Sequence, residues 1–227
     1  MLKAVIFDVD GTLVDSNLGH VEAWREAFAH YGKELSAEEV FAQIGKGGDQ
    51  LMPVFLSQHE LERFGQALEA LRVEIFTRDY LPGVTPFPKV RELFERLKRS
   101  GVKIALASSS QEAEVEHHQK TLEVEDLVDV ATSKDDVERS KPCPDIFETA
   151  LARLDGVAPD EAIVVGDTPY DVIAAARCGM KTIALLCGGF PAEALREAGA
   201  IAIFDDVAQL LDHFEASPLA ASATALP

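Results

Sequence analysis

The chain has 227 residues, of which 47% are hydrophobic and 26% charged, and this composition is typical of a globular protein with a sizeable buried core. Its formal net charge of −18 disfavours nucleic acid or an anionic membrane surface as a partner. It has no apolar run long enough to cross a bilayer, no pattern of a secretory signal, and no metal-site or disulfide spacing among its three cysteines. We therefore expect a cytoplasmic protein, monomeric or homodimeric.

A short apolar run at residues 3–7 predicts the first strand, and the segment DVDGT follows it at residues 8–12. Because Asp8 and Asp10 are two positions apart at a strand end, we expect both carboxylates to point into one crevice. Two desolvated acids are costly without a use, so a purely structural explanation is weak here. Gly11 would let a ligand approach the backbone, so it and Thr12 are candidates for phosphate binding. For Thr12 a helix cap paired with Asp15 is an equal alternative.

From about residue 17 to residue 80 the chain is helical in pattern, with no convincing strand. Apolar residues recur at helical spacing from Trp24 onwards, a second helix starts at Ser36, three glycines interrupt residues 45–48, and a long helix completes the segment. An insert of roughly 65 residues is too long for a loop. We interpret residues 16–81 as a small all-helical cap domain inserted after the first strand.

Further short apolar runs follow the insert. They predict strands at residues 103–107, 127–131, 162–165, 181–186 and 200–204, separated by segments of helical period. Such runs alternating with helices indicate a parallel sheet covered on both faces. We therefore predict a doubly wound α/β core, built from residues 1–15 and 82–215. The Ser-, Ala- and Pro-rich residues 216–227 predict a disordered tail.

The predicted strand at 103–107 leads into three serines and then into a helix. Backbone amides at a helix start, with hydroxyls beside them, suit a phosphate group. Ser108 and Ser109 are therefore candidates for phosphate binding, although this pattern alone is more typical of a simple helix cap.

Two later segments also place polar groups after buried strands or at helix starts. Lys141 precedes two prolines that stiffen the chain and start a helix, so its direction is fixed. A held ammonium can neutralise phosphate charge, whereas a solitary lysine is usually solvated. The strand at 162–165 then runs into GDTPYD, which carries Asp167 and Asp171, although Asp167 alone could be a helix cap.

The carboxyl ends of parallel strands meet at one edge of a sheet, where ligands bind in folds of this class. The acids expected at that edge are Asp8, Asp10, Asp167 and Asp171. Each like-charge pair at about 4 Å costs about 4 kcal/mol at an effective dielectric of about 20, so the cluster requires a cation. Oxygen ligands with room for water suit Mg²⁺. The sequence therefore predicts a magnesium site beside Lys141, at which an anionic substrate can bind despite the negative net charge.

These motifs, in this order, resemble the haloacid dehalogenase superfamily of phosphatases. The resemblance rests on DVDGT at 8–12, on Ser108, on KPCPD at 141–145, on GDTPYD at 166–171 and on the position of the helical insert. Among the capped members, the chain is similar to phosphoglycolate phosphatases and β-phosphoglucomutases. The resemblance implies an enzyme that hydrolyses the phosphate monoester of a small metabolite with Mg²⁺, through an aspartyl-phosphate intermediate.

The resemblance also implies roles for individual residues. Asp8 would be the nucleophile and, with Asp167 and the backbone carbonyl of Asp10, a metal ligand. Asp10 would protonate the leaving oxygen and then activate water. The residues that would hold phosphate oxygens or support the metal are Ser108, Lys141 and Asp171.

The subfamily is less sharply defined. Asp10 disfavours a dehalogenase or a phosphonate hydrolase, because both lack this acid. Asp15-Ser16, His20 and Trp24 resemble the hinge and first cap helix of the mutases, whereas GDTPYD is closer to the phosphatase form. We prefer a phosphatase, with a sugar-phosphate mutase and a non-catalytic binding module as alternatives. The intact acids weigh against the binding module.

Two cap residues are further candidates for substrate contact. Lys46 lies in the glycine-rich segment at 45–48, where capped members carry a specificity loop, and we hypothesise that it contacts an anionic or hydroxylated part of the substrate. A flexible surface turn is the alternative. His20 is either a hinge residue near Asp10 or a satisfied helix histidine.

Overall fold

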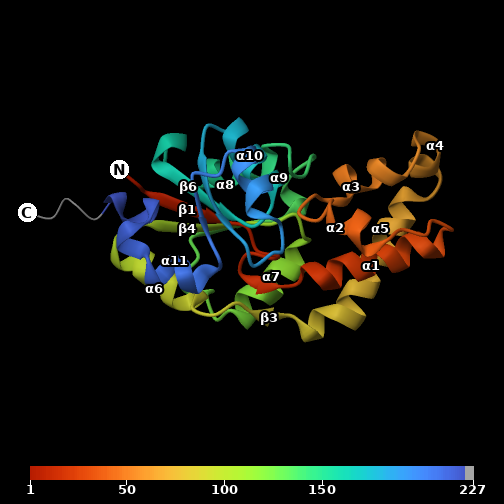
Figure 1. The fold of residues 1–227 in the computed structure, drawn as a ribbon, viewed down its shortest axis with the longest axis horizontal. Helices are drawn as coiled ribbons and strands as arrows, with labels where there is room; N and C mark the ends of the chain where they lie inside the picture. The colour runs from red at the N-terminus through yellow and green to blue at the C-terminus, as the bar shows by residue number, and fades with distance from the viewer. Residues whose placement is uncertain (223–227) are drawn as a thin grey trace, which may run out of the picture.

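The computed structural model describes residues 1–222, which form a six-stranded sheet flanked by helices and a separate helical lobe (Figure 1). The strands are β1 (Ala4–Phe7), β4 (Lys103–Ala107), β5 (Val130–Thr132), β6 (Ala162–Gly166), β7 (Lys181–Leu185) and β8 (Ala202–Phe204). They are ordered β5-β4-β1-β6-β7-β8, and every neighbouring pair is parallel. The predicted doubly wound α/β core is confirmed.

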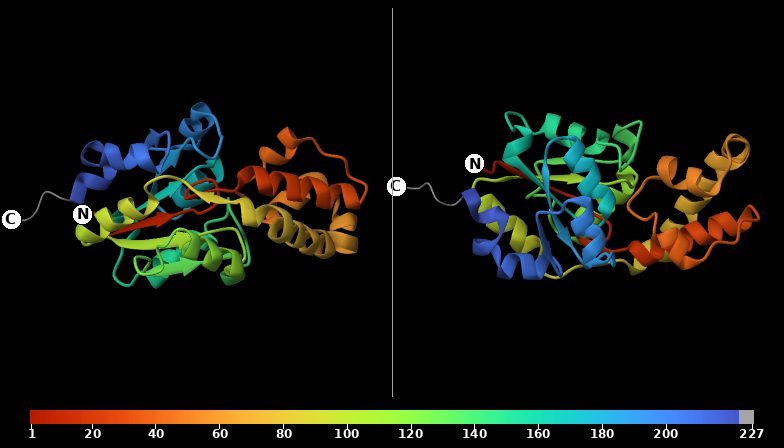
Figure 2. Two further views of the ribbon diagram at one scale, coloured as in Figure 1. Left: turned by 90° about the horizontal axis from the view of Figure 1, so that it is seen from below. Right: turned by 45° about the horizontal axis from the view of Figure 1, so that its top comes forward.

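Helices cover both faces of the sheet, because successive side chains of each strand point to opposite faces and both sets are apolar (Figure 2). Val5 and Phe7 belong to one apolar cluster, and Ala4 and Ile6 belong to another on the opposite face. The first cluster contains residues of α6 (Val90–Arg99), α7 (Glu112–Thr121) and α11 (Val207–Asp212). The second contains residues of α8 (Asp145–Arg153) and α9 (Pro169–Arg177), and α10 (Ala192–Ala198) packs beside α9.

The centre of the sheet positions the functional residues. β1 lies between β4 and β6, so the carboxyl ends of these three strands are adjacent. Asp8 follows β1, Ser108 follows β4 and Asp167 follows β6. Strand order reverses at β1, which makes this edge the switch point where open α/β sheets bind ligands.

The cap is a helical lobe with its own apolar core, placed beside the carboxyl ends of the strands (Figure 1). Its helices are α1 (Asn17–His30), α2 (Ala37–Phe41), α3 (Gly48–Phe55), α4 (Gln58–Glu60) and α5 (Gln66–Ile75). The predicted start at Ser36 is correct, since Ser36 and Glu39 form a capping box at α2. The predicted long helix is interrupted by π-helical turns at Leu61–Gly65 and Phe76–Tyr80.

A two-stranded ribbon joins cap and core. β2 (Val14–Asp15) and β3 (Thr85–Pro86) pair antiparallel, so the two chain connections between the lobes lie side by side. The sequence analysis did not find this ribbon, because strands of two residues carry no readable alternation. It also fixes Asp15 in a strand, not in the helix-cap pair with Thr12 considered above.

The loop between α2 and α3 seats the cap on the core. The Tyr170 hydroxyl donates to the carbonyl of Ala42 at 2.5 Å, and the Ser109 hydroxyl donates to the carbonyl of Gly45 at 3.3 Å. The backbone amide of Ser140 donates to the Asp49 carboxylate at 3.0 Å. Further contacts are the stacked rings of Phe41 and Phe190 and an ion pair between Glu69 and Lys134. The structure therefore shows the cap closed over the strand ends.

Two predicted segments differ from the structure. The strand expected at 127–131 begins only at Val130, because Leu127 and Val128 donate their amides to Val124 in a turn. The tail expected from residue 216 begins with ordered 3₁₀ turns at Phe214–Ala216 and Pro218–Ser222, and Leu219 is buried against the core. Apolar packing by this leucine outweighs the disorder-prone composition, and residues 223–227 lie outside the described part. No helix in residues 1–222 is long and apolar enough to cross a membrane.

Candidate active site

Asp8 lies at the end of β1, at the floor of the crevice between core and cap. Its backbone amide still donates to the carbonyl of Val165 in β6, so the sheet fixes its position. Its side chain is only 3% exposed, and one carboxylate oxygen accepts a hydrogen bond from Nζ of Lys141 at 2.5 Å. Burial raises the pKa of Asp8 well above its ordinary value, although the ammonium of Lys141 opposes this shift.

Lys141 is completely buried and held by three oxygen atoms. Besides Asp8, its Nζ donates to the carbonyl of Ala107 at 2.9 Å and lies 2.8 Å from Oδ1 of Asp171. Burial by itself would lower the pKa of Lys141, but the carboxylates of Asp171 and Asp8 outweigh burial and raise it. The site therefore holds a permanent positive charge against the carboxylate of Asp8.

Three buried carboxylates meet around this ammonium. Asp8, Asp167 and Asp171 each present an oxygen, and these atoms lie within 4.8 Å of one another. Asp167 accepts hydrogen bonds from the Thr12 hydroxyl at 2.8 Å and the Asn17 side-chain amide at 2.9 Å. Burial raises the pKa of Asp167 to about 7, and the charge of Asp171 adds to this effect. One ammonium among three buried acids leaves negative charge that a divalent cation could balance.

Asp171 is held in place by the start of α9. Its carboxylate accepts hydrogen bonds from the amide of Thr168 at 3.0 Å and from the Thr168 hydroxyl at 2.7 Å, and its own amide donates back to that hydroxyl. This capping box leaves the other oxygen directed at Lys141. The GDTPYD segment is thus both a helix start and a wall of the acidic cluster.

Two glycines allow Asp167 to approach the surrounding backbone. A Cβ atom at Gly188 would lie 1.7 Å from Oδ2 of Asp167, and one at Gly11 would lie 2.4 Å from the same oxygen. Gly11 also has a φ of 76°, which side chains rarely adopt. Both positions therefore require glycine for this geometry. Thr12, which was also a candidate for phosphate binding, is fully buried, and its hydroxyl donates a hydrogen bond to Asp167.

The carboxylate of Asp10 does not join the other three, contrary to the expected convergence of four aspartates. Oδ1 of Asp10 accepts from the Ser16 hydroxyl at 2.7 Å and lies 3.0 Å from Nε2 of His20, while Oδ2 accepts from the Ser110 hydroxyl at 2.9 Å. Asp8 and Asp10 line the same cavity, as their spacing predicted, but β1 ends at Phe7 and the chain then turns, with Asp10 bridging to Val14, so the Asp10 carboxylate is not part of the cluster of Asp8, Asp167 and Asp171. Burial alone would raise the pKa of Asp10, but His20 and the other partners hold it well below its usual range.

Two residues of α7 complete the surroundings of Asp10, and the sequence analysis missed both. Glu114 accepts a hydrogen bond from the Ser110 hydroxyl and lies 3.4 Å from Nε2 of His20. His118 is fully buried, with Nε2 3.6 Å from Asp10. Their spacing of four residues puts them on one helix face, but a charged face of that kind is ordinarily solvated. No pattern in the sequence indicates that this helix face turns inward.

The serines after β4 also take part. Ser108 is fully buried, and its hydroxyl accepts from the amide of Ser110 and donates to Asp10 at 3.3 Å. Ser109 lines the crevice and contacts the cap. The predicted phosphate-binding residues thus lie beside Asp8 and Asp10, and the possible capping role of Ser109 is not seen, since the residue before α7 is Gln111 and has no side-chain cap.

A cavity of about 40 Å³ lies between the floor formed by the core and the roof formed by the cap. Its lining residues from the core are Asp8, Asp10, Ser109 and Ser110, and those from the cap are Asn17, His20, Trp24, Ile44, Gly45, Lys46 and Arg72. His20 and Lys46, the two cap residues predicted from the sequence, thus both line the cavity. The His20 ring stacks on Phe76, whereas the ammonium of Lys46 lies 2.6 Å from the Gln43 side-chain oxygen and 4.5 Å from the centre of the Tyr170 ring. Arg72 was not among the sequence-based candidates.

Comparison with known proteins places the chain in a family. Residues 5–185 match the family of haloacid dehalogenase-like hydrolases. A phosphorylated carbohydrates phosphatase from Thermotoga maritima is 30% identical over 89% of this chain and 94% of its own. A phosphoglycolate phosphatase from Rhodospirillum rubrum is 30% identical over 93% of this chain and 90% of its own. The crystal structure of a hydrolase from Pseudomonas syringae superposes with a TM-score of 0.85 at 29% identity, covering 94% and 98% of the two chains.

The fold, the cap and the acidic site are thus those of a hydrolase with a doubly wound α/β core and a helical cap. This protein belongs to the haloacid dehalogenase-like hydrolases, as the motifs after the strands predicted.

Proposed function

We propose that this protein is a magnesium-dependent phosphatase that hydrolyses small phosphate monoesters through a phosphoryl group transferred to Asp8. The single observation that carries the proposal is the buried contact between Asp8 and Lys141, at 2.5 Å, within a cluster of three carboxylates. This arrangement gives a fixed oxygen nucleophile and a fixed positive charge at the same point. Phosphoryl transfer needs chiefly this positioning and charge neutralisation.

The acidic cluster fits a magnesium ion. The donors are carboxylate oxygens of Asp8, Asp167 and Asp171, with no histidine or cysteine among them, and such a set is typical of Mg²⁺. The backbone carbonyl of Asp10 is a further proposed ligand. When bound, the ion would neutralise charge on the phosphate oxygens and make three crowded acids tolerable.

The protein residues carry the proton and phosphoryl movements. An oxygen of Asp8 attacks phosphorus, the bond from phosphorus to the leaving oxygen breaks, and Asp10 gives that oxygen a proton. A water molecule then attacks the phosphoryl group while Asp10 takes its proton, and the carboxylate of Asp8 leaves with free phosphate as the other product. Because His20, His118 and Ser16 hold the pKa of Asp10 below its usual range against the effect of burial, we infer that substrate binding loosens the contacts of Asp10 with His20 and Ser16 before Asp10 acts as the acid.

Nothing in the geometry favours the sugar-phosphate mutase alternative. The GDTPYD segment is closer to the phosphatase form, and two relatives that are 30% identical to this chain are named phosphatases, which supports a phosphatase over a mutase. A non-catalytic binding module would not need the buried charges around Lys141, which are costly to desolvate.

The proposal is tested by turnover of an aryl phosphate with and without Mg²⁺. The wild-type protein should release phosphate only with the metal, and Asp8→Asn should be inactive while it unfolds at a similar temperature. The matched control is Asp160→Asn, an exposed acid on the core surface, which should keep wild-type activity. Equal turnover by Asp8→Asn and the wild type would reject the mechanism, and isomerisation of a sugar 1-phosphate without net phosphate release would favour the mutase.

A further inference from the structure

Arg72 is a buried cation without adequate partners. It lies on α5 of the cap and is only 6% exposed. Within residues 1–222, neither its Nε nor its Nη1 has a hydrogen-bond partner. The carbon at the centre of its guanidinium lies 5.1 Å from the centre of the Trp24 ring, so an aromatic face covers one side and leaves the planar donors unsatisfied.

A buried guanidinium with two unpaired donors is stabilised when an anionic ligand binds to it. Arginine does not lose its proton in proteins, so it cannot escape the cost of burial by becoming neutral. Acids nearby are already engaged: Glu69, one helical turn before Arg72, pairs with Lys134 of the core, and Asp10 is held by Ser16, His20 and Ser110. Within residues 1–222 no acid thus pairs with Arg72, and its Nε and Nη1 remain available as donors to a bound ligand.

The position of Arg72 in the cavity indicates which part of a substrate it could bind. Arg72 and Asp8 line the same cavity, one from the cap roof and the other from the core floor. A phosphate ester whose phosphorus faces Asp8 would direct its leaving group towards the cap. The planar fork of a guanidinium matches the paired oxygens of a carboxylate or a phosphate.

We propose that Arg72 binds a second anionic group, a carboxylate or a further phosphate, on the leaving group of the substrate, and that this contact selects the substrate class. The proposal rests on Asp8 as the phosphoryl acceptor. Lys46 is less suited to this role, because its ammonium is engaged by Gln43 and the face of Tyr170.

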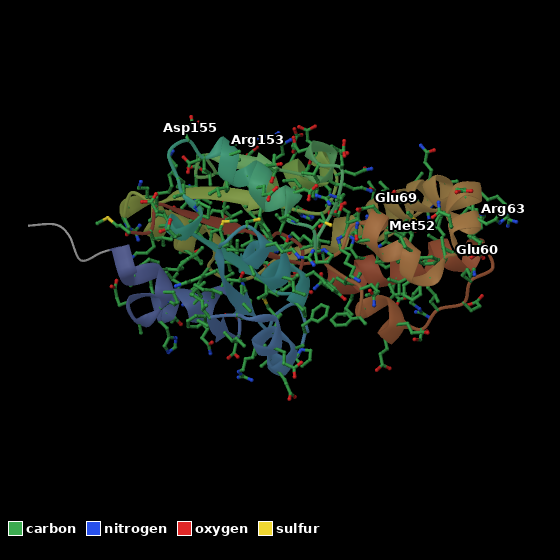
Figure 3. All side chains as sticks on the ribbon, turned by 90° about the horizontal axis from the view of Figure 1, so that it is seen from above. Met52, Glu60, Arg63, Glu69, Arg153 and Asp155 are labelled. Carbon is green, nitrogen blue, oxygen red and sulfur yellow. The ribbon has the colours of Figure 1, made fainter. Side chains whose placement is uncertain are left out.

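The activity test compares short phosphate esters that differ only in charge: 2-phosphoglycolate, 2-hydroxyethyl phosphate, and ethylene glycol bisphosphate. The proteins are the wild type, Arg72→Met, Arg72→Lys and the control Arg63→Met, whose side chain lies at the far end of the cap (Figure 3). In the wild type, kcat/KM for an ester with a second anionic group should exceed that for 2-hydroxyethyl phosphate, whose leaving group is uncharged, by about 10- to 100-fold, since hydrogen bonds to charged groups have this strength. Arg72→Met should bring this ratio close to one, Arg72→Lys should keep part of it, and Arg63→Met should keep all of it.

A binding measurement makes the result independent of turnover and of folding. Calorimetric titration compares methylphosphonate with phosphonoacetate and with methylenediphosphonate, and melting temperatures identify any variant that has lost its fold. If Arg72→Met lowers kcat/KM or affinity more for the ligands with a carboxylate, the second group is a carboxylate. If it lowers them more for the ligands with two phosphorus groups, the second group is a phosphate. An unchanged preference in folded Arg72→Met, or no preference in the wild type, overturns the Arg72 proposal while the phosphatase remains. A wild type that hydrolyses no ester but binds phosphonoacetate through Arg72 would instead refute the proposed function alone.

Discussion

The functional residues of this site are defined by how their charges are balanced. Among the residues described, Lys141 is the only ammonium that pairs with the cluster of three buried carboxylates, and it contacts two of them, Asp8 and Asp171. A buried ion pair contributes little net stability, but removing one partner leaves an uncompensated buried charge. The residues of the site are therefore coupled to folding as well as to chemistry.

Lys141→Met should destabilise the metal-free protein by about 3 kcal/mol or more, because Asp8 and Asp171 then lack their cation. Urea unfolding measures this change. The control is Lys98→Met, which breaks a partly exposed pair with Asp129 and should cost less than about 1 kcal/mol. An equal decrease in the free energy of unfolding of both variants would show that the buried ion pairs of Lys141 matter no more for stability than a partly exposed pair.

The raised pKa of Asp167 gives a prediction for pH. Because burial raises this pKa to about 7, the folded metal-free protein keeps a proton that the unfolded chain has already released above about pH 4. This contribution to the free energy of unfolding therefore falls as the pH rises from about 4 to about 7. Mg²⁺ competes with that proton, so the increase in melting temperature that Mg²⁺ produces should grow between about pH 5 and 8.

Thermal unfolding with Mg²⁺ or with EDTA at several pH values checks this prediction. Subtracting the two curves removes titrations that do not involve the metal site, such as those of surface acids. Asp167→Asn should lose most of the pH-dependent increment. An increment that is the same at all pH values would be inconsistent with a metal held by Asp167.

At the scale of elements, the site depends on how the cap is seated. The loop between α2 and α3 approaches the core closely, and a Cβ atom at Gly47 would lie 2.1 Å from the hydroxyl of Ser140. Gly47 does not have the positive φ that only glycine tolerates, so its role is close approach and not backbone conformation. The glycine-rich segment is thus a contact surface between two lobes, not the flexible surface turn considered from the sequence.

Gly47→Ala should push the cap away from the core without unfolding either lobe. We expect kcat/KM to fall by about tenfold or more, since small displacements of positioning groups have large effects on rate. Hydrogen exchange should increase in residues 42–49. The control is Gly83→Ala, where a Cβ atom meets nothing within 4 Å. Wild-type exchange and activity in Gly47→Ala would mean that the seating seen here does not matter for catalysis.

Whether a site residue could be predicted from the sequence depended on the kind of element that carries it. Asp8, Asp167 and Asp171 were found because they follow strands with continuous apolar runs that end at one edge of a parallel sheet, and Lys141 was found because two prolines follow it and fix the direction of the chain. Asp10 shares the cavity with Asp8 as predicted, but its carboxylate lies outside the cluster of Asp8, Asp167 and Asp171, because the chain turns once β1 has ended. Glu114, His118 and Arg72 were missed for a different reason. They lie on helices, where a charged residue is ordinarily solvated, and only packing between distant elements buries them.

For the whole molecule, the net charge of −18 raises the question of how an anionic substrate is admitted. The buried cations near the strand ends, Lys141 on the core side and Arg72 on the cap side, lie at the one place where negative charge is to be received. A divalent ion on the acidic cluster would join these two cations and make the site locally attractive to small anions, whereas the negative field of the rest of the molecule disfavours large polyanions. Figure 2 shows the two lobes, and residues of both line the cavity between them.

The most direct test of the account is chemical quenching of a single turnover. Wild-type protein is mixed with Mg²⁺ and an aryl phosphate, stopped in acid at successive times, digested, and searched by mass spectrometry for a phosphoryl group. The account predicts transient phosphorylation of the peptide that contains Asp8, preceding the release of free phosphate, and none in Asp8→Asn. Phosphate release by Asp8→Asn at the wild-type rate, or a phosphoryl group found on another residue of the wild type, would contradict it.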